Sequence, residues 1–284
     1  PIWNLPLKHP VNMAYEAATA DLNDVNMIDP FHLEAYGETT VNYNRDVEIF
    51  PVLNAIFEGI YGKSPYKSPT DMGVNMAGFC IVDDQVCRDA SNQEIIRRYY
   101  QALTRAATDA GSPEEVYKIE LLMKKDNITQ SMRQVVGVCN TLAAAQQSPA
   151  AAMELNDGRI VTGKTSALLG ASAALLLNAV KELAGIPHEV HVIAPSAIEP
   201  IQTLKTRYLG SHNPRLHTDE VLIALSVSAA TDPNAEKALA QLPKLADCQV
   251  HTSVMLSQVD INTFKKLRIQ LTSEPVYEHK KLYR

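Results

Sequence analysis

Residues 153–165 read MELNDGRIVTGKT, and this stretch decides the local fold because it fits two incompatible structures. Its last eight residues spell G-x-x-x-x-G-K-T, the pattern of a phosphate-binding loop. Such a loop keeps its interior small, so that backbone N–H groups can curl around the anion. Here the interior is Arg-Ile-Val-Thr, in which three of the four residues favour extended backbone. Asp157-Gly158 is a two-residue hairpin signal, so the stretch predicts a β-hairpin and not a phosphate loop.

A long apolar helix is expected to follow the hairpin, over residues 167–184. Lys164, Thr165 and Ser166 stand directly before it, where the first N–H groups of a helix need partners. Either hydroxyl can cap those groups, and this is the interpretation that we favour. In the alternative, a bound anion satisfies them, and all three residues then belong to a ligand site.

Predicted strands and helices alternate in the rest of the second half. The strands are expected at residues 190–194, 250–256 and 269–271. The helices are expected to begin at Ser196 with Glu199 as a capping box, and at the capping residues Thr218, Asp232 and Asp260. This interleaving predicts an α/β fold with a mostly parallel or mixed sheet. Ligands then bind outside the carboxyl ends of the strands, near Pro195-Ser196 and Ser257-Gln258.

The 284 residues suffice for two domains. We place the boundary at the Gln-Gln-Ser-Pro segment, so that the domains span residues 1–148 and 149–284. In the first, an irregular polar segment precedes predicted helices. These helices are expected over residues 50–60, from the Ser91 capping box to about Ala107, and from Ser112-Pro113 onwards. Residues 127–152 are rich in Ala, Gln and Val and carry no recognisable chemistry.

Composition excludes several classes of protein. The chain is 46% apolar and 20% charged, as in ordinary globular domains, and no apolar stretch is as long as a bilayer span. A net charge of −6, without a run of Lys or Arg longer than two, argues against nucleic acid and anionic membranes as partners. The four cysteines form no C-x-x-C pair, which favours reduced, buried thiols and a cytoplasmic location over disulfides or a structural zinc.

Five runs of sequence are long enough to be specific: PIWNLPLKHP (1–10), NMIDPFH (26–32), YNRD (43–46), SPTDMGVN (68–75) and NPRLHTDE (213–220). They resemble the bacterial family called domain of unknown function 1846. The resemblance implies that the chain is the C-terminal portion of a longer protein, as the non-Met first residue Pro1 also suggests. It implies further that residues 1–148 are the remainder of an α/β domain plus a helical segment, preceded by a Gly-rich loop. It supplies no reaction, no cofactor and no catalytic residue.

Two polar clusters in the first half are candidate sites. One lies in residues 29–46 and offers hard oxygen ligands, a general base and an anion clamp. Its members are Asp29, His32, Glu34, Asn42, Arg45 and Asp46. The other is Asp71 and Asn75 beside Gly73, which permits a tight turn against a ligand. In the alternative, the Asn and Asp side chains of both loops only build turns.

The third cluster, residues 210–220, reads GSHNPRLHTDE around a predicted helix start. Arg215 can hold a phosphate or carboxylate, and His217, oriented by Asp219, can serve as acid or base. In the alternative, Thr218 is an ordinary cap and Asp219 complements the helix dipole. We favour a site because groups with shiftable pKa values cluster here. The dipole lowers and Asp219 raises the pKa of His217, which predicts titration close to neutral pH.

We therefore expect a cytoplasmic bacterial protein that binds a small anionic, phosphorylated ligand between its two domains and acts on it enzymatically. The residues expected to carry chemistry are His217, Asp219 and His32. Those expected to bind the ligand are Lys164, Thr165, Ser166, Arg215, Arg45, Asp71 and Asn75. Residues 31–46 are expected to meet residues 215–220 in space. Two alternatives remain open, a metal-assisted hydrolase using His217, Asp219 and the Asp29/His32 loop, and a non-catalytic sensor or homo-oligomeric assembly protein.

Overall fold

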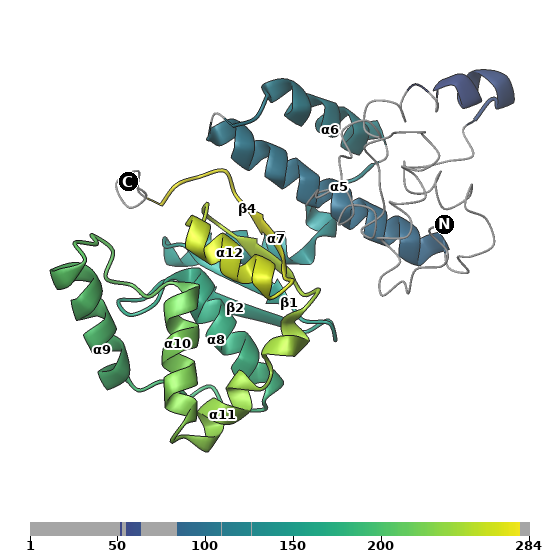
Figure 1. Ribbon diagram of the computed structural model, residues 1–284. Helices are drawn as coiled ribbons and strands as arrows, with labels where there is room; N and C mark the ends of the chain where they lie inside the picture. The colour runs from purple at the N-terminus through teal and green to yellow at the C-terminus, as the bar shows by residue number, and fades with distance from the viewer. Residues whose placement is uncertain (1–51, 53–54, 64–83, 109, 126, 279–284) are drawn as a thin grey trace, which may run out of the picture. The chain divides into compact units, whose positions relative to one another are not determined.

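The computed structural model of the chain describes residues 52, 55–63, 84–108, 110–125 and 127–278 (Figure 1). The chain divides into two compact units. The N-terminal unit is Pro1–Ala102 with Gly111–Met132, and the C-terminal unit is Leu103–Ala110 with Arg133–Arg284.

The described part of the N-terminal unit is helical. Residues 55–61 are helical, and they are followed by α5 (Asp84–Ala107), α6 (Pro113–Lys125) and the short 3-10 helix η2 (Gln130–Met132). The hydroxyl of Tyr99 donates to Glu120 of α6 over 3.2 Å. Ser112 accepts from the N–H of Glu114 over 3.1 Å, so its predicted capping role is confirmed. The predicted helix start at Ser91 is wrong, because α5 already begins at Asp84.

The C-terminal unit contains the sheet. Its elements, in order, are α7 (Gln134–Gln146), β1 (Ala150–Glu154), β2 (Ile160–Lys164), α8 (Ala171–Leu183), α9 (Pro195–Thr203), the π-helix η3 (Leu204–Tyr208), α10 (Thr218–Ala229), α11 (Pro233–Leu239), η4 (Leu242–Leu245), β3 (Gln249–Thr252), α12 (Gln258–Lys266) and β4 (Gln270–Ser273). The strand order is β2-β1-β3-β4. Strand β1 is antiparallel to both β2 and β3, whereas β3 and β4 are parallel. The predicted α/β class with a mixed sheet is therefore confirmed.

The G-x-x-x-x-G-K-T stretch is a hairpin, as predicted. Residues of β2 pair in register with β1, from Glu154 with Ile160 to Ala150 with Lys164. The turn closes with a 2.9 Å bond from the N–H of Leu155 to the carbonyl of Arg159. Gly158 adopts a φ of +84°, a conformation that favours glycine.

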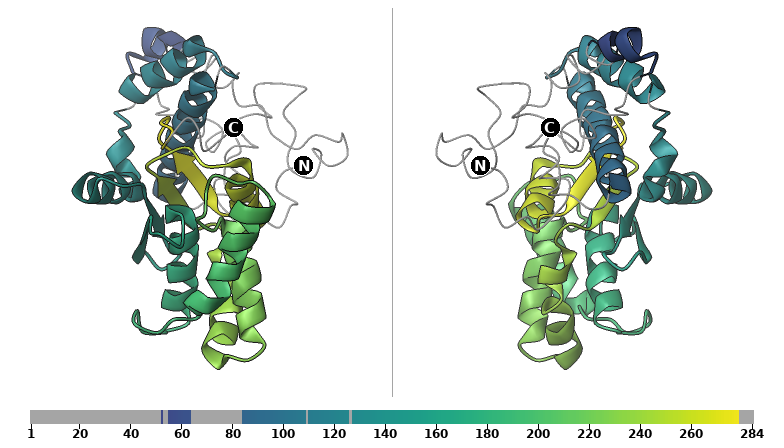
Figure 2. Two further views of the ribbon diagram at one scale, coloured as in Figure 1. Left: turned by 90° about the vertical axis from the view of Figure 1, so that its left-hand side faces the viewer. Right: turned by 90° about the vertical axis from the view of Figure 1, so that its right-hand side faces the viewer.

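Helices cover both faces of the sheet (Figure 1). Ala150 and Ala152 pack with Val135 and Cys139 of α7 on one face. Ala151 and Met153, which alternate with them along β1, belong to the larger core formed with α8, α10, α11 and α12. Helices α10 and α11 lie side by side in the turned views of Figure 2.

Buried Arg133, only 1% exposed, attaches the start of α7 to the strands. It donates to the hydroxyl of Thr272 over 3.1 Å and to the carbonyls of Val250 and Gln270 over 3.0 and 2.8 Å. His251, fully buried, lies 2.9 Å from the same hydroxyl. Burial lowers the pKa of His251, which keeps the ring neutral beside this cation.

Gly163 allows α8 to pack directly on β2. A Cβ at this position would lie 2.5 Å from the carbonyl oxygen of Ala171 and closer still to the backbone of Leu175. All of these atoms belong to the backbone of α8 and cannot move aside as a flexible side chain could, so only glycine fits at position 163. The second glycine of the phosphate-loop pattern is thus a packing residue in a strand.

Three details of the second half differ from the predictions. Residues 190–194 are not a strand. Val192 and Ile193 are buried in the core, but the segment lies between a turn and Pro195 at the start of α9, and an apolar run this short does not define a strand. The Ser196 capping box is absent, because the N-cap is Ala194. Thr218 and Asp260 lie inside helices α10 and α12, whose N-caps are His217 and Ser257, whereas Asp232 caps α11 as predicted.

Cys139 and Cys248 are free and buried. Burial raises their pKa values to about 12 and about 11, so both are protonated at neutral pH. Both thiols therefore act as small buried hydrophobes, as predicted. Among the described residues, no helix is both long and apolar enough to cross a bilayer.

Candidate functional site

A pocket of about 330 Å³ lies where helices α8, α10 and α12 begin, entirely within the C-terminal unit. Its polar lining residues are Thr165, Ser172, Asn213, Arg215, His217, Thr252, Ser257, Gln258, Asp260 and Glu278. The N-terminus of a helix carries unsatisfied N–H groups and a partial positive charge. Protein side chains accept from N–H groups at the starts of α10 and α12, so the uncapped start of α8 is the end that favours a negatively charged occupant.

Asp260 connects the starts of α10 and α12. The residue is 4% exposed, and its carboxylate accepts from the backbone N–H and the hydroxyl of Thr218, both over 2.9 Å, and from the hydroxyl of Ser257 over 2.8 Å. The ring of His217 lies 3.0 Å away. Burial alone would raise the pKa of Asp260, but its bonds with His217, Thr218 and Ser257 together hold it below the usual value. The carboxylate is therefore charged at neutral pH.

His217 presents one ring nitrogen to Asp260. Its Nδ1 lies 3.0 Å from Asp260 Oδ2 and 3.4 Å from the Ser257 hydroxyl. Within the described residues, no group is bonded to Nε2, and the side chain remains 29% exposed at the pocket. The hydrogen bond to Asp260 raises the pKa of His217, although partial burial opposes the shift. A carboxylate-oriented imidazole with an accessible nitrogen is suited to general acid–base chemistry.

The carboxylate on His217 is thus Asp260, and the prediction that Asp219 orients this ring is wrong. Asp219 lies in the first turn of α10 and accepts from the N–H of Glu220 over 2.8 Å. Among the described residues, no hydrogen bond joins Asp219 to the ring of His217. The residue 43 positions further along the chain, Asp260, takes that role.

We expect Asp260→Asn to lower the pKa of His217 and Asp219→Asn to leave it nearly unchanged. Because the pKa of His217 is raised in the folded state, its pairing with Asp260 contributes stability fully below the unfolded pKa of about 6.5. That contribution is lost as the pH rises through the folded pKa. NMR titration of the ring and unfolding measured between pH 5 and 9 test this. Equal pKa values in the two variants would contradict it.

A buried lysine supports the loop that carries Arg215 and His217. Lys205, 6% exposed, belongs to the π-helix η3, a geometry that often occurs at functional sites. Its Nζ donates to the carbonyl of Arg215 and to Glu220, each over 2.7 Å. Glu220 in turn accepts from the N–H of His217 over 2.8 Å. Lys205 therefore holds the loop directly at Arg215 and, through Glu220, at His217.

Arg215 lines the pocket, where its guanidinium donates to Glu278 over 2.6 Å. The side chain is 31% exposed, so part of the group remains accessible to a ligand. Its backbone N–H is held by the Asn213 side chain over 3.1 Å. The predicted anion-binding residue is therefore located at a pocket and is paired with a carboxylate.

Helix α8 begins at this pocket without a side-chain cap. Its N-cap is Gly170, and the helix starts at Ala171 and not at residue 167 as predicted. Thr165 and Ser166 consequently lie too far upstream to cap it: the Ser166 hydroxyl accepts from Leu168 and Leu169, and the N–H of Thr165 donates to Pro149. Ser172, on the first turn, is 5% exposed and lines the pocket.

The other predicted site residues fall elsewhere. Lys164 lines a separate groove along β2, away from Arg215 and His217. His32, Arg45, Asp71 and Asn75 lie outside the described residues, as do both predicted first-half clusters and their expected contact with residues 215–220. Within the described part of the chain, no group of three or more His, Cys, Asp or Glu side chains is arranged to hold a metal ion.

Sequence analysis missed Asp260, Ser172 and Lys205. Ser257 and Asp260 fit the spacing of an ordinary capping pattern, which explained the carboxylate without a site. Ser172 sits in an apolar run, and nothing in the sequence indicates that Lys205 is buried. Asp260 and His217 are 43 positions apart, and no local sequence pattern links residues at that distance. The pair is therefore identified from the fold alone.

Comparison with known proteins shows which family the chain is similar to. The family profile described as Domain of unknown function DUF1846, C-terminal, matches residues 131–283, and the profile of the N-terminal domain matches residues 1–127. The predicted family is thus confirmed, but the resemblance is not restricted to a C-terminal portion.

Curated relatives agree over the whole chain. The UPF0371 proteins of Corynebacterium urealyticum and Streptococcus pyogenes serotype M3 are 56% and 54% identical to it over 284 residues. The match covers 100% of this chain in both cases, but 57% and 58% of the relatives. The UPF0371 protein of Corynebacterium aurimucosum is 59% identical over 99% of this chain and 56% of its own length. The chain spans little more than half of these relatives, and it belongs to the bacterial DUF1846 family.

Proposed function

We propose that the C-terminal unit binds a small anionic, phosphate-bearing ligand in the pocket at the starts of α8, α10 and α12, and that His217 transfers a proton to or from it. One observation carries the proposal: an imidazole held by a buried carboxylate faces the same pocket as an uncapped helix N-terminus. The first feature suits proton transfer and the second suits anion binding.

The anion is bound at the start of α8. The N–H groups there have no side-chain cap, and Ser172, on the first turn, adds a hydroxyl-bearing side chain to the pocket lining. Arg215 adds a guanidinium from the opposite loop. An anion that binds here competes with Glu278 for Arg215, so ligands with the charge and geometry of a phosphate gain most. Lys164, predicted to share this role, lines another groove and takes no part.

The chemistry assigned to His217 follows from its fixed orientation. With Nδ1 engaged by Asp260, Nε2 is the nitrogen that accepts a proton when neutral or donates one when protonated. Asp260 remains charged and stabilises the imidazolium that forms. The arrangement is suited to proton transfer at a bound phosphate ester.

A second function has support from one surface. Large apolar side chains are exposed on η3 and α10 and at the residue after η3, namely Leu204, Tyr208, Leu209, Ile223 and Val227. Such side chains favour a homo-oligomeric assembly, in which the pocket senses the ligand and performs no chemistry. Loss of self-association on Ile223→Lys, measured by sedimentation, together with unchanged phosphate binding, supports this alternative.

We expect Arg215→Ala to weaken binding of inorganic phosphate at least tenfold, because a charged hydrogen bond contributes about 1.5–3 kcal/mol. Lys164→Ala removes a cation outside the pocket and serves as the matched control, with an expected effect below twofold. Titration with phosphate should shift the amide NMR signals of Ala171, Ser172 and Ala173. Shifts absent at these amides, or equal losses in both variants, would contradict the anion site.

The catalytic part is tested separately with p-nitrophenyl phosphate. In this reaction water attacks phosphorus, the bond to the nitrophenolate oxygen breaks, and Nε2 of His217 takes the proton from the water. Release of nitrophenolate should be lost in His217→Gln, which keeps phosphate binding within about threefold because the ring is not the anion-binding group. Phosphate binding without turnover in the wild type would remove the enzymatic role and favour a sensor.

A further inference from the structure

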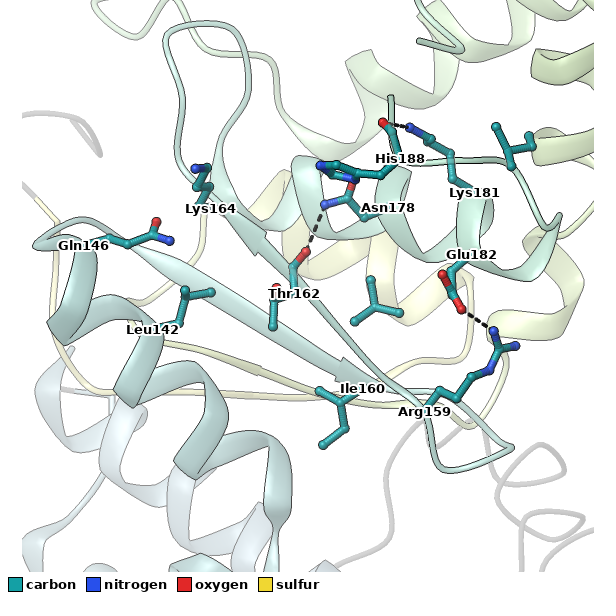
Figure 3. A pocket seen from close by; sticks show the side chains of 12 residues that line it. Leu142, Gln146, Arg159, Ile160, Thr162, Lys164, Asn178, Lys181, Glu182 and His188 are labelled. Atoms are coloured by element: carbon teal, nitrogen blue, oxygen red, sulfur yellow. Dashed lines mark hydrogen bonds and ion pairs between the residues drawn. The ribbon is translucent and has the colours of Figure 1, made fainter. Parts of the chain in front are cut away.

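We propose that the open edge of β2 binds an extended acidic peptide segment, which adds to the sheet as a fifth strand. The site is the groove of about 600 Å³ along β2, here called the β2 groove, and it is separate from the pocket at His217. Its lining residues from the strand are Ile160, Val161, Thr162 and Lys164 (Figure 3).

The backbone of β2 offers unpaired groups along this edge. Strand β2 is the edge strand in the order β2-β1-β3-β4, and among the described residues its one neighbouring strand is β1. The bonds from Leu155 N–H to Arg159 O and from Thr165 N–H to Pro149 O fix which residues face β1. In an antiparallel ladder these alternate, so the N–H and C=O groups of Ile160, Thr162 and Lys164 point outward. This is the spacing with which an added strand pairs.

One outward group already has a substitute for such a strand. The side-chain amide of Asn178 donates to the carbonyl of Thr162 over 2.9 Å, from the direction of the open edge. Figure 3 shows this bond inside the groove. A backbone N–H from a bound peptide can replace the Asn178 amide as donor, because the Thr162 carbonyl points outward from the strand into the groove.

Helices form walls on both sides of the edge. Leu142 and Gln146 come from α7, and Asn178, Lys181 and Glu182 come from α8. In Figure 3 Lys164 and Gln146 lie toward one end of the groove, Arg159 and Glu182 lie toward the other, and His188 is drawn beside Asn178. A walled groove admits a single extended chain more easily than the edge of a second folded domain. The five residues of β2 span about 17 Å, enough for a short peptide strand.

The charge of the lining favours an acidic segment. Arg159, Lys164 and Lys181 are cationic, whereas Glu182 is the one carboxylate among the lining residues. Arg159 already pairs with Asp157 and Glu182, and Lys181 donates to the carbonyl of His188 over 2.7 Å. Lys164 is exposed and has no bonded partner among the described residues, so a carboxylate of the bound strand can pair with it.

The same charges disfavour a second copy of this chain as the occupant. Antiparallel pairing of two β2 strands about Thr162 would put Lys164 of one copy opposite the apolar Ile160 of the other. That position supplies no carboxylate, so the charge of Lys164 would stay unpaired across the strands. An acidic peptide gains at the positions where a second copy loses.

The test uses a fluorescein-labelled, end-blocked heptapeptide of alternating Glu and Val, with binding to the full chain followed by fluorescence anisotropy. Two control peptides replace Glu by Lys or carry N-methyl groups on alternate amides, which removes strand pairing but keeps the side chains. We expect each control to bind at least tenfold more weakly. Lys164→Glu should weaken binding of the acidic peptide by a similar factor. Lys265→Glu makes the same charge change on α12 and should have little effect.

The bound register is tested by amide hydrogen exchange. The peptide should slow exchange of the Ile160, Thr162 and Lys164 amides and leave those of Val161 and Gly163, already bonded to β1, unchanged. Thr162→Pro removes one outward N–H donor and should therefore reduce affinity at least tenfold. The variant should still fold, because proline is tolerated on an open strand edge. If that variant fails to fold, the N-methylated peptide makes the same test. No binding at millimolar peptide, or binding insensitive to N-methylation, overturns the proposal and leaves Lys164 as a guard against edge pairing.

Discussion

Gly163→Ala is expected to destabilise the C-terminal unit by about 3 kcal/mol or more, the upper end of the range for overpacked sites. The added methyl group would lie 2.5 Å from the carbonyl oxygen of Ala171 and closer to backbone atoms of Leu175. Both contacts are with the backbone of α8, so relief requires the helix to move away from β2. That movement opens the core that Leu175 and Leu176 form with the sheet.

Gly137→Ala is the matched control for this substitution. Gly137 lies inside α7, and a Cβ there meets no atom within 4 Å. The same chemical change should therefore stabilise the protein by about 0.5–1 kcal/mol, because alanine loses less entropy in a helix. The free energy of unfolding of each variant is measured in urea, with hydrogen exchange of the β1 amides as the probe of the C-terminal unit. Equal stability of the two would show that α8 does not rest on β2 as closely as described.

Asp260→Ala is expected to cost about 3 kcal/mol of stability and to abolish any proton transfer by His217. The substitution leaves the N–H and hydroxyl of Thr218 without their acceptor inside the protein, and it removes the partner of the Ser257 hydroxyl. Breaking a buried pair on one side costs this much because the remaining polar groups stay desolvated. The starts of α10 and α12 also lose the side chain that joins them.

Asp219→Ala separates this effect from the general loss of an acidic residue at a helix start. Asp219 accepts one bond within its own helix, from Glu220, so we expect a loss below about 1 kcal/mol. Thermal unfolding at pH 7 distinguishes the variants. A cost for Asp219→Ala as large as that for Asp260→Ala would mean that Asp260 does not hold the two helices together.

The hairpin was predictable from the sequence because residues close together in the chain determine it. Asp157-Gly158 defines the turn, and three extended-backbone residues follow it. The mixed α/β class followed from the interleaving of periodic segments. Helix α7 escaped prediction because its Ala- and Val-rich sequence is apolar on most sides and shows no clear polar face. The supposed strand at residues 190–194 shows the reverse error, since burial of Val192 and Ile193 comes from packing without pairing.

The site was predictable only in part, for the same reason. His217, Arg215 and Thr165 stood out from local chemistry, and the structure brings all three to one pocket. The partner of His217 depends on which helix starts are adjacent, and that is decided by the sheet order and not by the residues beside it. A nearby acid, Asp219, was the natural choice from sequence, whereas the fold supplies Asp260.

The strand order has a consequence for the growing polypeptide. In the finished sheet β1 lies between β2 and β3, but residues 155–248 separate it from β3 in sequence. During synthesis the hairpin and α8 can form early, while the other edge of β1 waits for a partner made much later. Pairings between distant segments are slow, and an unpaired strand edge attracts other chains. Strand β1, enclosed between β2 and β3 in the native sheet, therefore keeps one unpaired edge until residues 249–252 have left the ribosome.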